Sequence, residues 1–347
     1  MSPVGLDAAA WQRLGHYLFE RGVTSGAELA GELLSGGQSN PTYRLRCGAE
    51  EFVLRKKPAG QLLPSAHAID REYRVMKALA DTPVPVPDML VYCEDSSLIG
   101  TPFYVMPFLQ GRVIFDQTLP GMTPSERCLV YADMNRALAQ LHLVNPSQVG
   151  LSDFGRAGNY FGRQIRRWSQ QYLDNHTDRI DALEHLIQWL PEQIPEDDIT
   201  TIVHGDYRLD NVMLHPTEPK VIAVLDWELS TLGHPLADFS YHCMSWHIPP
   251  SLWRGIGGLD LGALGIPSEP DYIEQYVQTT GYTGVQEHWD FYLAYNFFRI
   301  AAILYGIGER ARQGTAAAPD AVEMAAKAEP LAQIGWRYAQ QYQARRR

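Results

Sequence analysis

One segment near the middle of the chain constrains the fold more than any other. Residues 202–211 read IVHGDYRLDN, and Asp226 follows fifteen residues later, at the end of the aliphatic run 221–225. The alternation of apolar residues predicts short strands at 200–203, 212–214 and 221–225. The sequence therefore predicts a loop that carries an Asp and an Asn, followed by a hairpin that ends in a second carboxylate.

The polar residues of this segment suit phosphoryl transfer from ATP. That reaction needs a group that orients the acceptor hydroxyl and oxygen ligands that hold magnesium. Asp206 is the expected catalytic residue, because a carboxylate can accept a hydrogen bond from an alcohol and take its proton. Asn211 and Asp226 are the expected ligands of Mg²⁺, which needs few protein ligands beside phosphate oxygens. His204 is expected to orient the loop.

The N-terminal part of the chain has the pattern of a small β-rich lobe. A helix capped by Asp7 precedes residues 32–55, whose alternation predicts strands and a hairpin with its turn at Gly48. Ser65 is expected to cap a helix that ends near Ala80. Two further strands, at 89–93 and 103–106, follow a proline-rich stretch that stops this helix.

A nucleotide is expected to bind along these strands. Backbone N–H groups of the glycine-rich segment 34–40 can approach phosphate, and a hinge at 106–108 can bind the adenine edge. Arg55 ends a strand and can reach the phosphates; Lys57, on the same face, is the alternative. Glu72, in the next helix, is the expected ionic partner of this cation. The residues expected at the nucleotide are Gly36, Gly37, Ser39, Asn40, Arg55, Glu72, Met106 and Phe108.

Beyond Phe108 the pattern becomes mostly helical. Thr123 and Glu126 have the spacing of a capping box for a helix that reaches His142. Further helices are expected at 160–175, at 181–190 and through most of the chain after Pro235. We therefore predict an α+β fold with two lobes, a β-rich N-lobe over 1–108 and a mostly helical C-lobe over 109–347. A cleft between lobes is a common place for ligands.

The charge and composition exclude several classes of protein. The net charge is −11, which disfavours nucleic acid as a partner, since such proteins normally present a basic face. No stretch approaches the roughly 18 uninterrupted apolar residues of a membrane span. The start of the chain resembles an amphipathic helix more than a signal peptide. The four cysteines are scattered, which favours reduced thiols and a cytoplasmic location over a disulfide framework or structural zinc.

Taken in order, from about Leu33 to Ser245, these pieces resemble the aminoglycoside phosphotransferase and choline kinase-like family, a branch of the protein-kinase-like fold. The resemblance implies ATP and Mg²⁺ as cofactors, Asp206 as the catalytic Asp, and Asn211 and Asp226 as metal ligands. It also implies that Asp238 braces the catalytic loop. The chain has Asp-Trp-Glu at 226–228 instead of Asp-Phe-Gly and has no Ala-Pro-Glu segment, so a regulated protein kinase is not expected.

Three longer segments resemble one branch of this family. FVLRKKP at 52–58, YFGRQIRRW at 160–168 and LDWELSTLGHP at 225–235 are similar to the branch that is fused to, or encoded beside, acyl-CoA dehydrogenases. That resemblance implies a hydroxyacyl-CoA acceptor, with 4-hydroxy acids as leading candidates, and a functional link to an acyl-CoA dehydrogenase. The acceptor candidates are Arg163, Arg167, Arg208, Trp246 and Arg299; Arg163 and Arg167 have the i, i+4 spacing of one helix face and can bind phosphates.

Three other functions stay open at this point. Within the same class, the acceptor can be an aminoglycoside antibiotic, which would call for an acidic pocket. A non-catalytic nucleotide-binding protein of the same fold is the second. A metal-dependent hydrolase built on His204 and Asp206 is the third, but it needs more ligands than His215, Glu228 and His234 supply. The sequence predicts neither the oligomeric state nor the choice of ATP over GTP.

Overall fold

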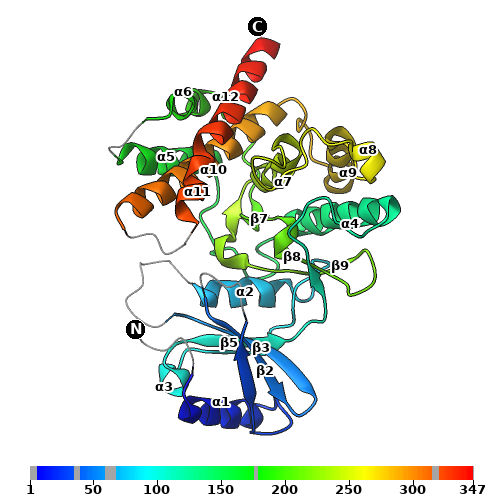
Figure 1. The fold of residues 1–347 in the computed structure, drawn as a ribbon, viewed down its shortest axis with the longest axis vertical. Helices are drawn as coiled ribbons and strands as arrows, with labels where there is room; N and C mark the ends of the chain where they lie inside the picture. The colour runs from blue at the N-terminus through cyan, green and yellow to red at the C-terminus, as the bar shows by residue number, and fades with distance from the viewer. Residues whose placement is uncertain (1–5, 35–39, 59–67, 176–178, 315–319, 347) are drawn as a thin grey trace.

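The chain folds into two lobes that meet at the middle of the molecule (Figure 1). The computed structural model describes residues 6–34, 40–58, 68–175, 179–314 and 320–346. A small antiparallel sheet with its helices forms the N-lobe, and a larger, mostly helical assembly forms the C-lobe. The predicted fold class, α+β with a kinase-like two-lobed architecture, is confirmed.

The N-lobe is built on five antiparallel strands. Their order across the sheet is β1-β2-β3-β5-β4. Helix α1 packs its apolar face on this sheet through Leu14 and Leu18, and α2 lies between the sheet and the C-lobe (Figure 1). The elements are α1 (Ala8–Glu20), β1 (Ala30–Leu33), β2 (Thr42–Cys47), β3 (Glu50–Lys56), α2 (Ile69–Leu79), β4 (Val91–Cys93), α3 (Ser96–Ile99) and β5 (Phe103–Pro107).

Local sequence signals account for these elements. On β2 the alternate residues Tyr43 and Leu45 are buried, and they pair with Leu54 and Phe52 of β3. Gly48 makes the hairpin turn at φ +58°, where a side chain would be strained. The Asp7 carboxylate accepts the Ala10 N–H at 2.7 Å, as predicted for the helix cap. Helix α2 begins at Ile69, and the predicted cap Ser65 lies outside the described residues.

Long helices dominate the C-lobe. Thr123 and Glu126 form the predicted capping box at the start of α4. Helix α10 lies at the centre; it is long and apolar enough to cross a membrane, but 83% of its apolar window is buried inside the protein. The helices are α4 (Pro124–Leu143), α5 (Tyr160–Leu173), α6 (Asp181–Trp189), α7 (Pro235–Cys243), α8 (Leu261–Leu264), α9 (Glu269–Thr280), α10 (Trp289–Arg312), α11 (Ala321–Ala326) and α12 (Ala328–Arg345).

Two small sheets at the edge of the C-lobe that faces the N-lobe position the catalytic segment (Figure 1). Strand β7 (Thr201–Val203) pairs with β10 (Thr231–Gly233), and β8 (Val212–Leu214) pairs with both β6 (Arg112–Val113) and β9 (Val221–Val224). The three strands predicted around the catalytic segment are therefore present. The exact lobe boundary at residue 108 stays a prediction.

Candidate active site

The loop after β7 is held in place by its own histidine. The buried His204 ring lies 2.8 Å from the Leu225 carbonyl through Nε2, and its Nδ1 accepts the Asp206 N–H at 3.2 Å. A neutral ring protonated on Nε2 satisfies both contacts. His204 thus ties the catalytic loop to the end of β9, which is the orienting position that the sequence predicted.

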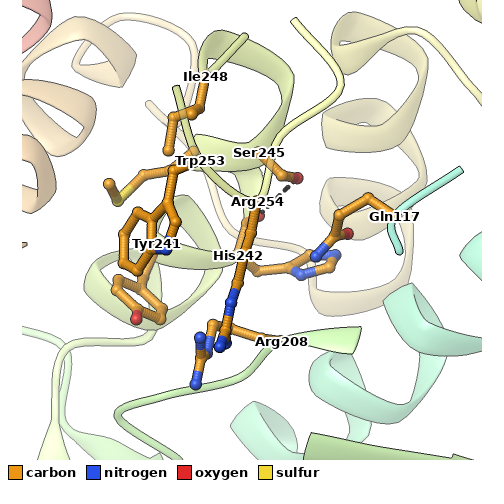
Figure 2. Close-up of a pocket in the computed structure, with 9 residues that line it drawn as sticks. Gln117, Arg208, Tyr241, His242, Ser245, Ile248, Trp253 and Arg254 are labelled. Carbon is orange, nitrogen blue, oxygen red and sulfur yellow. Dashed lines mark hydrogen bonds between the residues drawn. The ribbon is translucent and has the colours of Figure 1, made fainter. Parts of the chain in front are cut away.

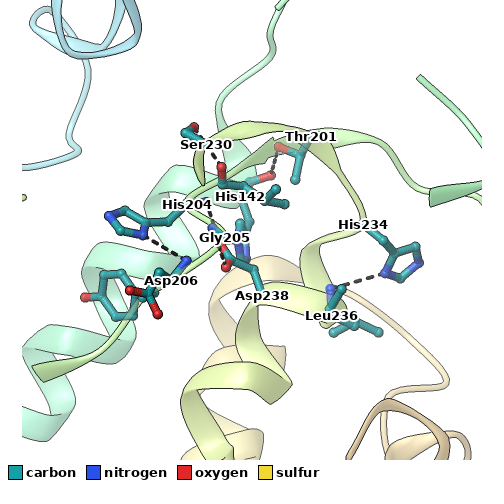
Figure 3. A network of polar contacts seen from close by, with 12 residues as sticks. His142, Thr201, His204, Gly205, Asp206, Ser230, His234, Leu236 and Asp238 are labelled. Atoms are coloured by element: carbon teal, nitrogen blue, oxygen red, sulfur yellow. Dashed lines mark hydrogen bonds and ion pairs between the residues drawn. The ribbon is translucent and has the colours of Figure 1, made fainter. Parts of the chain in front are cut away.

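A buried carboxylate braces the same loop from below (Figure 3). Asp238, on α7, accepts the backbone N–H of His204 at 2.6 Å and that of Gly205 at 2.9 Å, and its Oδ2 lies 3.3 Å from His142 Nε2. Burial alone would raise the pKa of Asp238, but His142, His204 and the donated hydrogen bonds lower it on balance. The loop therefore rests on an ionised acid.

Asp206 projects from this loop among several donors. Its Oδ1 accepts the Tyr241 hydroxyl at 2.6 Å and lies 2.9 Å from Arg208 Nε. Its Oδ2 accepts Arg208 Nη2 and Asn211 Nδ2, both at 3.0 Å. Asp206 is partly buried at the boundary between the lobes, so its carboxylate is fixed in direction.

Asn211 and Asp226 come together beside it. The backbone N–H of Leu225 donates to the Asn211 carbonyl at 2.8 Å, which holds the end of β9 against the catalytic loop. The Asn211 amide nitrogen donates to Asp206, so its oxygen remains as a ligand. Asp226 has φ +62° and a carboxylate that is 37% exposed. One amide oxygen and one carboxylate form a donor set that fits Mg²⁺.

On the N-lobe side, Arg55 is the cation that faces this acid. Its Nη2 lies 3.3 Å from Asp226 Oδ1, and its Nε lies 3.3 Å from Oε2 of the buried Glu72. Glu72 also accepts hydrogen bonds from Tyr104 and from Asn40. Burial raises the pKa of Glu72 to about 7, against the opposing charge of Arg55. The predicted pair of Arg55 and Glu72 is therefore present.

A cavity of about 250 Å³ opens between the lobes beside this pair. Its lining includes Arg55, whereas Lys57 is not among the described residues that line it, which favours Arg55 of the two cations proposed from the sequence. Asp226 and the segment 106–109 also line it. The apolar lining and the charged Arg55 suit a nucleotide, whose base is apolar on both faces and whose phosphates are anionic.

One prediction about this cavity needs correction. Asn40 is fully buried and donates to Glu72 at 3.1 Å, so it positions the acid rather than offering that donor to phosphate. Phe108 lines the cavity, as predicted for the hinge, but its N–H donates to the Glu51 carbonyl at 3.0 Å. That single donor is therefore used within the N-lobe. The other residues of the predicted phosphate-covering loop, Gly36, Gly37 and Ser39, lie outside the described residues.

A second, much smaller cavity, of about 30 Å³, lies in the C-lobe (Figure 2). Arg208 and Tyr241 line it and also contact Asp206. Arg254 adds a second guanidinium, and both arginines form ion pairs with Asp210. The remaining lining residues are largely apolar or aromatic: Gln117, His242, Met244, Ser245, Ile248 and Trp253. Sequence reasoning missed Arg254 and Trp253, which belong to no motif and to no regular element.

The predicted acceptor residues have different positions. Arg208 lines the second cavity, as predicted for an acceptor residue. Arg299 donates to the Gly205 carbonyl at 2.9 Å and lies 5.1 Å from the Tyr241 ring centre, so it supports the loop. Trp246 does not line this cavity: it is buried, and its Nε1 donates to the Pro267 carbonyl at 3.0 Å.

The arginines of α5 do not line this cavity either. The Arg163 guanidinium donates to the backbone carbonyls of Arg156 and Ala157, which makes it part of the structure of the preceding loop. Arg167 is exposed beside the Trp168 ring. The predicted basic face thus exists only in part, since one of its two arginines is used to hold the backbone.

Comparisons with known proteins agree with this geometry. The model of the phosphotransferase enzyme family matches residues 30–291. A crystal structure from Ralstonia eutropha JMP134, provisionally assigned as an aminoglycoside phosphotransferase, is 50% identical with a TM-score of 0.88, and the match covers 97% of this chain and 99% of that one. The aminoglycoside phosphotransferase APH(4)-Ia, in a complex with ADP and hygromycin B, is 16% identical with a TM-score of 0.59 over 93% and 97% of the chains, a likeness of fold alone.

Curated relatives carry names of a different kind. Acyl-CoA dehydrogenase family member 10 of Mus musculus is 47% identical over 305 residues, which cover 87% of this chain and 28% of that protein. Acyl-CoA dehydrogenase family member 11 of Homo sapiens is 40% identical over 323 residues, which cover 93% and 41%. The chain thus spans less than half the length of these curated relatives. It belongs to the phosphotransferase enzyme family.

Proposed function

We propose that this chain transfers the γ-phosphoryl group of ATP to a hydroxyl of a hydroxyacyl-CoA, with a 4-hydroxyacyl-CoA as the leading acceptor. The observation that carries the proposal is that Asp206 contacts residues associated with two cavities. It contacts Arg208 and Tyr241, which line one cavity, and Asn211, whose carbonyl binds Leu225, a residue in the wall of the other. The larger one contains Arg55 and Asp226 and suits the nucleotide. The smaller one begins at two residues that contact Asp206, and suits the acceptor.

In the proposed reaction, the acceptor hydroxyl binds the Asp206 carboxylate. The hydroxyl oxygen forms a bond to the γ-phosphorus, the bond from that phosphorus to the β–γ bridging oxygen breaks, and ADP leaves. The hydroxyl proton passes to Asp206 and then to solvent. Asp238 and Arg299 hold the loop so that Asp206 keeps its direction. Arg55, paired with Glu72, stabilises the phosphates of the nucleotide.

The donor set beside Asp206 also fits a magnesium ion. The Asn211 side-chain oxygen and the Asp226 carboxylate would hold it, and the bound ion would neutralise negative charge on the phosphates. Asp226 already faces Arg55 across the cavity, so both would act on the same end of the nucleotide.

The chemistry of the second cavity favours an acyl acceptor over an aminoglycoside. Aminoglycosides carry several positive charges. The charged groups that line the cavity are Arg208 and Arg254, which are already paired with Asp206 and Asp210, and no Asp or Glu is among the described lining residues to attract such a cation. Its apolar wall, which includes Ile248 and Trp253, suits an acyl chain. Homologues named as acyl-CoA dehydrogenase family members support a link to acyl-CoA metabolism. A cytoplasmic location stays a prediction.

The test is ADP release with Mg-ATP across an acceptor panel. The panel contains 3-, 4- and 5-hydroxyacyl-CoAs, the free hydroxy acids, choline and kanamycin. We expect turnover on a hydroxyacyl-CoA, its loss in Asp206→Asn, and no change in Asp88→Asn, a matched substitution of an exposed acid. Turnover on kanamycin and not on the acyl-CoAs would refute the proposed acceptor. Nucleotide binding without turnover of any acceptor would favour a non-catalytic protein.

A further inference from the structure

The Asp206 carboxylate has no free side for an acceptor hydroxyl in this structure. Its Oδ1 contacts Tyr241 and Arg208 Nε, and its Oδ2 accepts from Arg208 Nη2 and Asn211. A carboxylate oxygen offers about two lone-pair sites. Oδ2 fills both with the donors of Arg208 and Asn211, whereas Oδ1 accepts from Tyr241 and is covered by Arg208 Nε, which lies 2.9 Å away without forming a hydrogen bond. An alcohol can therefore donate to Asp206 only after one of these three neighbours has moved away.

Two of the three neighbours are held by other contacts. The Asn211 amide also donates to the Asp206 backbone carbonyl at 2.8 Å, and Asn211 is buried. The Tyr241 ring lies against the Arg299 guanidinium, which is itself bonded to the loop at Gly205. Removing either side chain from Asp206 would disturb the loop that positions the acid.

Arg208 is the neighbour that can leave. Its side chain is 24% exposed and lines the acceptor cavity. It has a second carboxylate partner, Asp210, whose Oδ2 lies 3.5 Å from Arg208 Nη1 and which also pairs with Arg254. A guanidinium carries five N–H donors in a planar fork, so Arg208 can exchange one oxygen partner for another and keep its charge paired.

We propose that Arg208 makes catalysis depend on the acceptor: it holds Asp206 until a carbonyl or carboxylate oxygen of the acceptor binds its guanidinium and frees the acid for the hydroxyl. The inference rests on the proposed function. In a 4-hydroxyacyl group the carbonyl lies three carbons from the carbon that bears the hydroxyl, so one molecule can reach both residues. Water has no such second group and leaves Asp206 bound to Arg208.

The structure thus assigns to Arg208 a role in selecting the acceptor over water. Hydrolysis of ATP needs the same breakage of the β–γ bridging bond, with water as the nucleophile and its proton passed to Asp206 or solvent. Because Arg208 covers Asp206 whenever the cavity contains no acceptor, water is not oriented for attack. Without an acceptor, the wild-type protein is therefore expected to bind ATP but to hydrolyse it much more slowly than it phosphorylates the acceptor.

The experiment compares acceptor-free ADP release with acceptor-dependent ADP release in Arg208→Gln. We expect acceptor-free hydrolysis to rise roughly tenfold, a factor that corresponds to about 1.4 kcal/mol, while turnover of 4-hydroxybutyryl-CoA falls and its KM rises. Arg208→Lys keeps the charge and should lie between the variant and the wild type. Arg136→Gln, which changes an exposed ion pair of α4, is the matched control and should leave both rates unchanged.

Three acceptors show whether a carbonyl or a carboxylate oxygen of the acceptor binds Arg208. Turnover of the thioester alone identifies the carbonyl, turnover of free 4-hydroxybutyrate identifies the carboxylate, and plain butanol, which has neither, should not be phosphorylated by the wild type. Equal turnover of butanol would overturn the inference.

Binding of ATP, measured separately by calorimetry, distinguishes failure of the inference from failure of the proposed function. If the wild type does not bind ATP, the proposed function and the inference both fall. If Arg208→Gln binds ATP like the wild type but hydrolyses it no faster without acceptor, the inference alone is refuted. A loss of both rates would mean that Arg208 only supports Asp206, and this outcome also overturns the inference.

Discussion

Asp238→Asn is the substitution that most sharply tests how the catalytic loop is held. The wild-type carboxylate makes hydrogen bonds of 2.6 Å and 2.9 Å to two consecutive backbone N–H groups and lies 3.3 Å from His142. An amide keeps one accepting oxygen and turns an NH₂ group toward the other N–H. One hydrogen bond to a charged acceptor is then lost, at about 1.5–3 kcal/mol, and the second becomes a neutral bond of about 1 kcal/mol.

The expected loss of unfolding free energy is therefore about 3 kcal/mol, which a domain of ordinary stability, about 5–15 kcal/mol, survives. Catalysis should suffer more than stability, because Asp206 follows directly after the released segment. A displacement of about 1 Å at the reacting groups can lower a rate by about 100-fold. Urea unfolding and kcat with the best acceptor of the panel measure the two effects.

Ser240→Ala is the matched control for this substitution. Ser240 lies on the same helix, is buried, donates to the Leu236 carbonyl and accepts from Asn296 Nδ2 at 2.7 Å. The variant should lose about 2 kcal/mol of stability, for two hydrogen bonds, and keep its kcat. Two results together would refute the reasoning. The unfolding free energy of Asp238→Asn would lie within about 0.5 kcal/mol of the wild-type value, the usual range for neutral surface changes, and its turnover would be unchanged.

Three further predictions follow from buried positions. Gly205→Ala should lower the free energy of unfolding in urea by at least about 1–2 kcal/mol. The reason is that Gly205 has a φ of +85° and an added Cβ would lie 2.7 Å from the Leu229 carbonyl oxygen. A variant as stable as the wild type would contradict this prediction. Trp246→Ala should cost about 3–5 kcal/mol in the same assay without changing the acceptor KM, and a selective rise in KM would restore Trp246 as an acceptor residue. Burial lowers the pKa of His242 from 6.5 to about 4. The neutral ring therefore contributes its full stabilisation above pH 6.5. This contribution, about 3 kcal/mol in total, is lost as the pH falls from 6.5 toward 4. Unfolding free energies measured across this range should fall less steeply in His242→Gln, and parallel curves would contradict the assignment.

The elements of the fold were predictable where the signal is local. The capping box at Thr123 and Glu126 and the alternation on β2 depend on residues a few positions apart, and both are present in the structure. The set of Asp206, Asn211 and Asp226 was also predictable, because one loop and one hairpin carry all three. These residues lie on one loop and on the hairpin that follows it, so residues that are close in the sequence are also close in space.

The rest of the site depends on contacts between distant parts of the chain. Arg55 contacts Asp226, although the two residues are 171 positions apart in the sequence. The alternation of the strand placed both Arg55 and Lys57 on one face and could not decide between them. Trp246 was predicted at the acceptor but lies in the core, outside the lining of the second cavity. The sequence does not distinguish a tryptophan of the core from a tryptophan that lines a pocket. Arg254 was missed because an irregular segment gives no periodic signal, although it brings the second guanidinium to the acceptor cavity.

The most direct test of the central claim is the mass of the acyl-CoA product. Wild-type protein is incubated with Mg-ATP and 4-hydroxybutyryl-CoA, and the reaction is followed by mass spectrometry beside Asp206→Asn. We predict that the acyl-CoA gains one phosphoryl group, in equal amount to the ADP formed, and that the variant forms neither. An unmodified acyl-CoA in the presence of bound ATP, or a phosphorylated product formed equally by Asp206→Asn, would contradict the account.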